Sequence, residues 1–227
     1  MNQFNWTEES EKQWNQSADH WSSRSKKMWE TGSRKDIIPF LAQYVPVNSV
    51  ICDLGCGDGY GSRKLTLAGY SVTGVDVSDD MLHKAYTLNS DNNARFEKAD
   101  IGHLPFSDGS FDALMAINSL EWTESPLQVL DEMNRVLKRD GKACVAILGP
   151  TAGPRTNSFP RLYGKKSICN TMMPWEFERL LKENGWQKLD EFGVYKQDSI
   201  GVSMEKLPLN LKQALSFFWV FMLKKSR

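Results

Sequence analysis

Neither sign of charge is in excess in this sequence. Lysine plus arginine and aspartate plus glutamate each number 28, so the formal net charge of the 227 residues is zero. A broad surface for nucleic acid needs an excess of positive charge. We therefore expect no nucleic-acid partner, although the composition permits a small basic patch. The length and the 41% of hydrophobic residues fit one globular domain with, at most, an added lid.

Metal-binding residues and long hydrophobic runs are also scarce. The chain has three histidines, and its four cysteines form no C-x-x-C pair, so zinc spacing is absent and we expect no metal. Cys52 and Cys144 lie in apolar runs and should be reduced packing residues. The longest apolar run, 217–223, is far shorter than the ~20 residues of a membrane span. With a polar start and no signal-peptide pattern, the sequence predicts a cytoplasmic protein.

Glycines, by contrast, are concentrated after the first apolar run. Residues 50–54 are strand-like, and residues 62–68 are typical of a helix that Gly69 ends. Between them are four glycines on alternate positions: Gly55, Gly57, Gly59 and Gly61. Glycine lets a backbone approach a ligand closely because no Cβ stands in the way. The segment therefore predicts a binding loop between a strand and a helix, and a simple tight turn is the alternative.

A carboxylate ends the next predicted strand. Residues 71–75 lead into Asp76, 21 positions after Gly55. A carboxylate at the end of the second strand can accept hydrogen bonds from both hydroxyls of a ribose. Residues 50–76 therefore predict a nucleoside-binding βαβ unit.

Two details bear on which nucleoside binds. The dinucleotide fingerprint G-x-G-x-x-G would place its third glycine on Tyr60 or Ser62, so neither register fits. Asp53 would repel a pyrophosphate but would attract a ligand that carries sulfonium and ammonium groups. An NAD(P)-dependent Rossmann oxidoreductase is therefore the alternative rather than the main hypothesis. A second alternative is a non-catalytic protein that binds a cofactor or a partner.

Four segments carry a resemblance to a known family. Asp53-Leu-Gly-Cys-Gly-Asp-Gly59 resembles motif I of the class I S-adenosylmethionine-dependent methyltransferases, and Gly74-Val-Asp-Val-Ser78 resembles their next motif. Asp100-Ile-Gly-His-Leu-Pro-Phe106 resembles their motif II. A helix from Ser125, the turn 135–141 and an apolar strand resemble the small-molecule "type 11" branch. The resemblance covers about residues 49–148.

The resemblance implies S-adenosyl-L-methionine as the cofactor. By resemblance, Asp100 accepts a hydrogen bond from the adenine amino group and the backbone N–H of Ile101 meets a ring nitrogen. Val77 and Met81 could pack against adenine or be ordinary core, and Arg34 could meet the methionine carboxylate or be a solvated surface residue. The predicted cofactor-binding set is Arg34, Asp53, Gly55, Cys56, Gly57, Gly59, Asp76, Val77, Met81, Asp100, Ile101 and Asn118.

The strand predicted at 111–117 ends in Asn118-Ser-Leu-Glu-Trp122. Ligands of open parallel sheets bind beyond the carboxyl ends of the strands, so this tip should face the reacting methyl group. It departs from the [N/D/S]-P-P-[Y/F] tip of exocyclic-amine DNA methyltransferases, which argues against base methylation. Glu121 is the candidate general base, with a solvent-facing position as its alternative.

Two further segments could border the site. Trp6, Trp14, Trp21 and Trp29 are spaced by 8, 7 and 8 residues and return to one helix face. We therefore predict a Trp-rich helical arm over residues 1–35, either a docked amphipathic helix or a lid, before a methyltransferase domain at 36–227. Residues 149–173 carry four basic residues and no acid, and we predict a substrate-side loop there, a solvated crossover being the alternative.

The resulting prediction is an α/β, Rossmann-like three-layer sandwich. Its sheet would be seven-stranded and mostly parallel, with an antiparallel C-terminal strand. The reaction would be direct displacement of the methyl group by an O, N or C atom of a small molecule of acidic or aromatic character. Such a reaction needs alignment and exclusion of water more than a dedicated catalytic group. The sequence makes no prediction of the oligomeric state.

Overall fold

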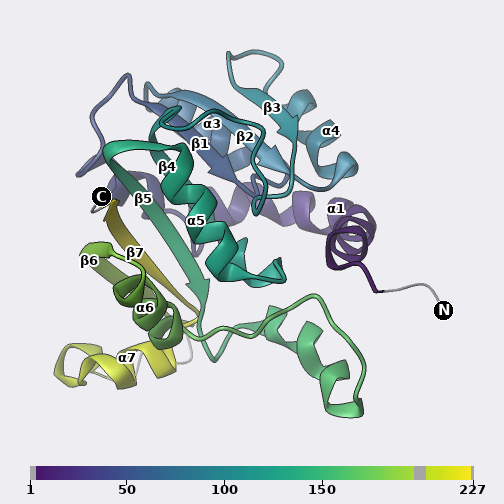
Figure 1. Ribbon diagram of the computed structural model, residues 1–227, viewed down its shortest axis with the longest axis vertical. Helices are drawn as coiled ribbons and strands as arrows, with labels where there is room; N and C mark the ends of the chain where they lie inside the picture. Colours follow the sequence, from purple (N-terminus) through teal and green to yellow (C-terminus); the bar gives the residue numbers. More distant parts are fainter. Residues whose placement is uncertain (1–3, 197–202, 226–227) are drawn as a thin grey trace.

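The computed structural model describes residues 4–196 and 203–225 of the chain (Figure 1). In this part, seven strands form one sheet in the order β3-β2-β1-β4-β5-β7-β6. β7 is antiparallel to both neighbours, and the other strands run parallel to one another. The predicted sheet is confirmed. The strands are β1 (Val50–Leu54), β2 (Ser71–Asp76), β3 (Arg95–Lys98), β4 (Phe111–Ile117), β5 (Leu137–Leu148), β6 (Trp186–Val194) and β7 (Phe218–Lys225).

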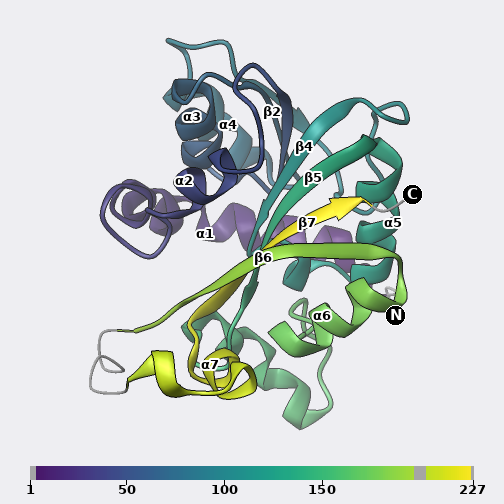
Figure 2. The same ribbon diagram turned by 90° about the vertical axis from the view of Figure 1, so that its left-hand side faces the viewer.

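Helices cover both faces of the sheet (Figure 1, Figure 2). One apolar core includes Leu130 of α5 and Phe177 of α6, and the other includes Ile37 of α2 and Leu65 of α3. This is the predicted three-layer sandwich. The helices are α1 (Trp6–Glu30), α2 (Ile37–Ala42), α3 (Tyr60–Leu67), α4 (Asp79–Leu88), α5 (Pro126–Val136), α6 (Pro174–Glu183) and α7 (Leu209–Leu215), with the 3₁₀ helices η1 (Leu120–Trp122), η2 (Gly153–Tyr163) and η4 (Met204–Lys206).

The C-terminal strand lies inside the sheet, between β5 and β6. Its residues from Phe218 to Leu223 are all buried. A strand covered on both faces needs no alternation of polar and apolar residues, which explains its uninterrupted apolar sequence. The apolar sequence predicts this strand over residues 215–223, but it begins at Phe218, because Leu209–Leu215 forms α7.

Two serines set where helices begin next to the strand ends. The Ser78 hydroxyl accepts a hydrogen bond from the backbone N–H of Met81, and the Ser125 hydroxyl accepts one from Gln128. Both serines are N-caps, a position that serine favours, and Pro126 follows Ser125 at the first helical position. They start α4 directly after β2 and α5 shortly after β4.

α1 lies outside the sandwich and crosses the carboxyl ends of the strands (Figure 1). Trp29, near its end, is buried in the core that contains α2 and α3. The Ser25 hydroxyl donates a hydrogen bond of 2.8 Å to Asp58 of the glycine loop. At the other end of α1, the indole N–H of Trp6 donates a bond of 2.6 Å to the carbonyl of Trp122. The helix is therefore held to the domain at both of its ends.

Candidate functional site

A cavity of about 180 Å³ lies beyond the carboxyl ends of β1, β2 and β4. α1 forms one wall, and the glycine loop, the segment after β3 and the start of α5 form the others. The predicted cofactor residues that line it are Arg34, Gly55, Cys56, Gly57, Asp76, Val77, Met81, Asp100, Ile101 and Asn118. Asp53, Gly59 and Glu121 lie outside the wall.

The glycine loop packs tightly between β4 and α1. Gly55 and Gly57 have φ angles of +71° and +55°, in the left-handed region that favours glycine. A Cβ on Gly55 would lie 2.5 Å from the Cβ of Ser119, and one on Gly57 would lie 3.4 Å from the indole nitrogen of Trp21. The backbone of this loop is therefore exposed to the cavity without side chains in between.

Gly59 and Asp53 have their neighbours behind the loop. Gly59 is the N-cap of α3, and a Cβ there would lie 2.8 Å from that of Ala85 in α4. Asp53 accepts a hydrogen bond of 2.7 Å from the Ser62 hydroxyl. Burial raises the pKa of Asp53 to about 7, against the opposing effects of Ser62 and Arg34. Asp53 can therefore act on a bound ligand only through its electrostatic field and not by direct contact.

Asp76 is held by the loop itself. Its carboxylate accepts hydrogen bonds from the backbone N–H groups of Gly57, at 2.8 Å, and Ser78, at 2.9 Å. Burial nevertheless raises the pKa of Asp76. An ionised carboxylate has about four acceptor positions, so Asp76 can accept further hydrogen bonds from a ligand in the cavity.

Arg34 is a buried cation without a paired anion among the residues that the structure describes. Only 7% of the residue is exposed. Its guanidinium lies 4.8 Å from the ring centre of Trp21 and 5.5 Å from that of Trp29, and it donates a long hydrogen bond of 3.5 Å to Asn118. It forms no salt bridge with any carboxylate in the described part of the chain.

The pKa of Arg34 reflects this position. Burial lowers it to about 10, while the more distant Asp58, Asp53 and Glu121 raise it. A buried charge is costly unless a partner compensates for it. Arg34 lines the cavity, so an anionic group of a ligand could supply that partner. The alternative of a solvated surface position for Arg34 is wrong.

The segment after β3 brings Asp100 and Ile101 into the wall. Asp100 accepts hydrogen bonds from the backbone N–H of Gly102, at 2.8 Å, and from the Thr7 hydroxyl of α1, at 2.7 Å. Thr7 is a site residue that the sequence analysis missed. Only its contact with Asp100, distant in sequence, identifies it.

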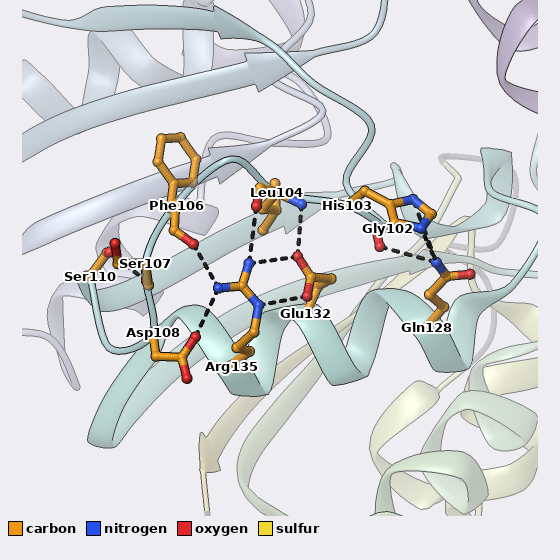
Figure 3. Close-up of polar contacts among 10 residues, drawn as sticks. All are labelled: Gly102, His103, Leu104, Phe106, Ser107, Asp108, Ser110, Gln128, Glu132 and Arg135. Carbon is orange, nitrogen blue, oxygen red and sulfur yellow. Dashed lines mark hydrogen bonds and ion pairs between the residues drawn. The ribbon is translucent and has the colours of Figure 1, made fainter.

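α5 braces this segment from outside (Figure 3). The Arg135 guanidinium donates hydrogen bonds to the carbonyls of Leu104, at 3.0 Å, and Phe106, at 2.6 Å, and also pairs with Glu132 and Asp108. The Gln128 amide donates a bond of 3.3 Å to the carbonyl of Gly102. The backbone that presents Asp100 is therefore fixed by side chains of the following helix. In the sequence, the turn at residues 135–141 was the feature that could have identified Arg135.

The tip of β4 contains two unusual features. Asn118 has a φ of +56°, which is uncommon for a residue other than glycine and is often found at functional sites. The Ser119 hydroxyl is buried and has no hydrogen-bond partner within the described chain. Buried polar groups are nearly always paired, so a ligand is a reasonable partner for this hydroxyl. Ser119 lines the cavity and was missed from sequence, where only its neighbours carried a motif.

Glu121 does not line the cavity and is 1% exposed, so the solvent-facing alternative is wrong. One carboxylate oxygen accepts a hydrogen bond from the backbone N–H of Leu148, and the other has no partner in the described structure. Burial raises the pKa of Glu121 to about 7, partly offset by the Leu148 bond and by Arg155. The group thus titrates near neutral pH, but its carboxylate is not in the wall.

Tryptophans form the side of the cavity opposite the strands. Trp14 meets Trp21 edge to face at 5.6 Å between ring centres and meets Trp122 at 5.1 Å. Trp6 also lines the cavity, whereas Trp29 belongs to the core. The arm therefore places three of its four tryptophans over the site.

The basic loop, residues 149–173, lies outside the cavity wall. No residue of 149–173 lines the cavity. Its Ala152, Ile168 and Cys169 instead pack behind Trp122, together with Leu148 and the aromatic residues at the start of the chain. The loop therefore supports one wall of the site from outside.

The described residues form neither a candidate metal site nor a helix that could span a membrane. No group of three or more His, Cys, Asp or Glu side chains there could hold a metal ion. No helix among them is long and apolar enough to cross a membrane. All four cysteines are buried and unpaired, and Cys52 and Cys144 are core residues as predicted.

Comparison with known proteins agrees with this geometry. Residues 52–145 match the methyltransferase domain family. The 27-O-demethylrifamycin SV methyltransferase of Amycolatopsis mediterranei is 28% identical over 216 residues, which cover 89% of this chain and 79% of that protein. The biotin biosynthesis bifunctional protein BioHC of Saccharophagus degradans is 36% identical over 113 residues, or 48% of this chain. The matched part of this chain spans only 20% of BioHC.

Solved structures share the fold. A SAM-dependent methyltransferase of Methanosarcina mazei superposes with a TM-score of 0.65 at 19% identity, and the match covers 82% of this chain and 97% of that one. At this identity the likeness concerns the fold alone. The residues that line the cavity indicate, independently of the fold, which chemical groups the chain could bind.

Proposed function

We propose that this chain, which belongs to the methyltransferase domain family through residues 52–145, transfers a methyl group from S-adenosyl-L-methionine to a small molecule. The observation that carries the proposal is the set of charges around the cavity. Arg34, a buried cation lacking an ion-pair partner in the described structure, shares the cavity with the acceptors Asp76 and Asp100. An amino acid joined to a nucleoside offers a carboxylate for the cation, and hydroxyl and amino donors for the two acceptors.

The residues of the wall fit the parts of that cofactor. Arg34 would hold the methionine carboxylate, and Asp76 would accept hydrogen bonds from the ribose hydroxyls. Asp100 and the backbone of Ile101 would bind the adenine edge, while Val77 and Met81 pack against its ring. Gly55 and Gly57 leave room for the chain between them, because neither carries a Cβ.

Bound in this way, the cofactor supplies a methyl group that its positive sulfur already activates. The protein's part is to align the acceptor and to exclude water. Trp14, Trp21 and Trp122 would exclude water, with α1 acting as a lid. Asn118 and Ser119, at the tip of β4, would orient the acceptor. Glu121 has a suitable pKa for a general base, but it would have to turn into the cavity to act as one.

The acceptor we propose is a small molecule with an aromatic or acidic part. The tryptophan wall suits an aromatic surface. The relative that aligns with most of this chain is named for a small molecule, 27-O-demethylrifamycin SV. An oxygen acceptor is therefore the first class to test, before nitrogen and carbon.

Calorimetric titration with S-adenosyl-L-methionine, NAD and NADP in parallel tests the cofactor. We expect micromolar binding of the first alone, weakened about 100-fold in Asp76→Ala because two hydrogen bonds to a charged group are lost. Asp131→Ala removes an exposed carboxylate of α5 and should leave affinity unchanged. Binding of a dinucleotide instead would favour an oxidoreductase.

A screen of oxygen acceptors (hydroxyls and carboxylates), nitrogen acceptors (amines) and carbon acceptors (electron-rich aromatic rings) with methyl-labelled cofactor tests the activity. Transfer of the label to one class of acceptor is the expected result. Tight cofactor binding with no labelled product across all three classes would favour the non-catalytic alternative.

A further inference from the structure

The segment that follows β5 projects from the molecule (Figure 1). Arg155 closes its base by donating hydrogen bonds to backbone carbonyls from both ends of the loop. The acceptors are Leu148 at 2.6 Å, Gly149 at 2.8 Å, Thr171 at 2.8 Å and Met172 at 2.7 Å. The projecting part, residues 156–167, is therefore anchored at its base.

Large apolar side chains stand exposed on this projection. Phe159 is 54% exposed, Leu162 is 64% exposed and Tyr163 is 72% exposed. Residues three apart share an edge of a 3₁₀ helix, which places Phe159 and Leu162 side by side, and the rings of Phe159 and Tyr163 are 5.7 Å apart. Exposed apolar clusters of this kind mark interaction sites.

Three cations lie close to the apolar side chains in the sequence, and one of them, Lys166, places its Nζ 5.0 Å from the centre of the Phe4 ring. Arg161, Lys165 and Lys166 are exposed, and none of them pairs with a carboxylate of the described residues. Residues 149–173 contain no acid although the whole chain has no net charge. The positive charge is thus local to the projection.

The projection and the cavity lie at the same end of the sheet. β5 runs parallel to β4, so its carboxyl end and the segment after it are at the end where the cavity opens. Ile168 and Cys169, where the loop returns, pack against the cavity residue Trp122. A surface bound to the projection would therefore lie on the side of the molecule that holds the cavity.

We propose that residues 159–166 form a docking surface for an anionic membrane. Phe159, Leu162 and Tyr163 enter the interfacial region of the bilayer, and the three cations contact anionic headgroups. A membrane fits better than an acidic protein because these apolar side chains stand on a projection of the backbone (Figure 1) and each is more than half exposed. The proposal does not depend on the cofactor, so it can fail or hold independently of the proposed reaction.

Co-sedimentation of the full chain with vesicles tests it. One population contains equimolar phosphatidylcholine and phosphatidylglycerol, and the other contains phosphatidylcholine alone. We expect about ten-fold more binding to the anionic vesicles, decreasing as salt is raised. Leu162→Ser and Lys165→Glu should each reduce that binding several-fold. Their matched controls, Leu67→Ser on exposed α3 surface and Lys182→Glu on α6, should not.

Three results would overturn the proposal. The first is equal binding of both vesicle populations, or of neither. The second is retention of polyglutamate through Lys165 with no vesicle binding, which would indicate an acidic protein partner. The third is a dimer in gel filtration that Leu162→Ser dissociates, which would make this face a contact between copies. Thermal melting of each variant confirms that the fold is intact.

Discussion

The hydroxyl of Thr7 donates a hydrogen bond of 2.7 Å to the carboxylate of Asp100. The first residue is in the opening turn of α1, and the second follows β3, at the point where the adenine edge is proposed to bind. This bond fastens the arm directly to a group of the site. The docked position of the arm and the placement of Asp100 therefore depend on the same hydrogen bond.

Thr7→Val should loosen the start of α1. It removes one hydrogen bond to a charged group, worth about 1.5–3 kcal/mol, at nearly constant side-chain volume. We expect hydrogen exchange of the residues around Trp6 and Trp14 to be at least several-fold faster, with exchange in β5 unchanged. Thr87→Val, on the exposed side of α4, is the control. Unchanged exchange in the arm would show that the tryptophans alone hold it.

Arg34→Met should weaken cofactor binding without lowering the stability of the folded protein. Replacing an unpaired buried charge with an apolar side chain of similar length should leave the free protein as stable or more stable. Cofactor affinity should fall about 100-fold, because a charge-assisted pair with the carboxylate is lost. Urea unfolding and calorimetric titration measure the two effects. A variant that unfolds more easily yet binds normally would assign Arg34 a structural role only.

Glu121→Gln should change how stability depends on pH. Burial raises the pKa of Glu121 from 4.5 to about 7 in the folded state, so the folded protein holds this proton more tightly than the unfolded chain. Its contribution to stability is fully present below about pH 4.5 and is lost as pH rises through about 7. As pH rises between these two limits, the free energy of unfolding of the variant should therefore increase by on the order of 3 kcal/mol relative to that of the native protein.

Urea unfolding at several pH values measures this difference. Asp53 titrates in the same range, but it is present in both proteins and cancels in the comparison. Glu124→Gln, which changes an exposed neighbour, should show no such trend. A constant difference between native protein and Glu121→Gln across the range would contradict a raised pKa.

The same variant tests the base role. If Glu121 takes a proton from the acceptor, Glu121→Gln should lose the acidic limb of the pH profile of kcat/KM as well as activity. If Glu121 only supports the end of β5 through Leu148, the variant should keep the shape of the profile. The pH profile distinguishes these cases where a simple loss of rate would not.

Gly55→Ala should unfold the loop region far more readily than Gly185→Ala. Both glycines have φ near +70°, so both variants pay about 1–2 kcal/mol for a left-handed alanine. A Cβ on Gly185 meets nothing within 4 Å, whereas one on Gly55 lies 2.5 Å from Ser119. The additional cost at Gly55 should be about 1–3 kcal/mol in urea unfolding. Equal losses of unfolding free energy in the two variants would show that the segment after β4 can move aside for the added methyl group.

The local parts of the site could be predicted from the sequence. The glycines follow the short apolar strand β1, Asp76 ends β2, Asp100 comes shortly after β3, and the capping serines start the next helices, so their positions depend on neighbouring residues alone. Parallel strands present their carboxyl ends at one edge, which brings these residues together without further information. The same reasoning correctly predicted the sheet and its antiparallel last strand.

Contacts between distant segments decided the rest. Arg34 is a cavity residue rather than a surface residue because α1 lays Trp21 and Trp29 against it. Gly59 faces α4, Glu121 faces the end of β5, and Thr7 reaches Asp100, and no spacing along the chain contains these contacts. They depend on how helices dock on the sheet, which is set by the packing of many side chains at once. The sequence alone thus determined which cofactor class to expect, and the tertiary structure decided which residues line the cavity in which we propose that it binds.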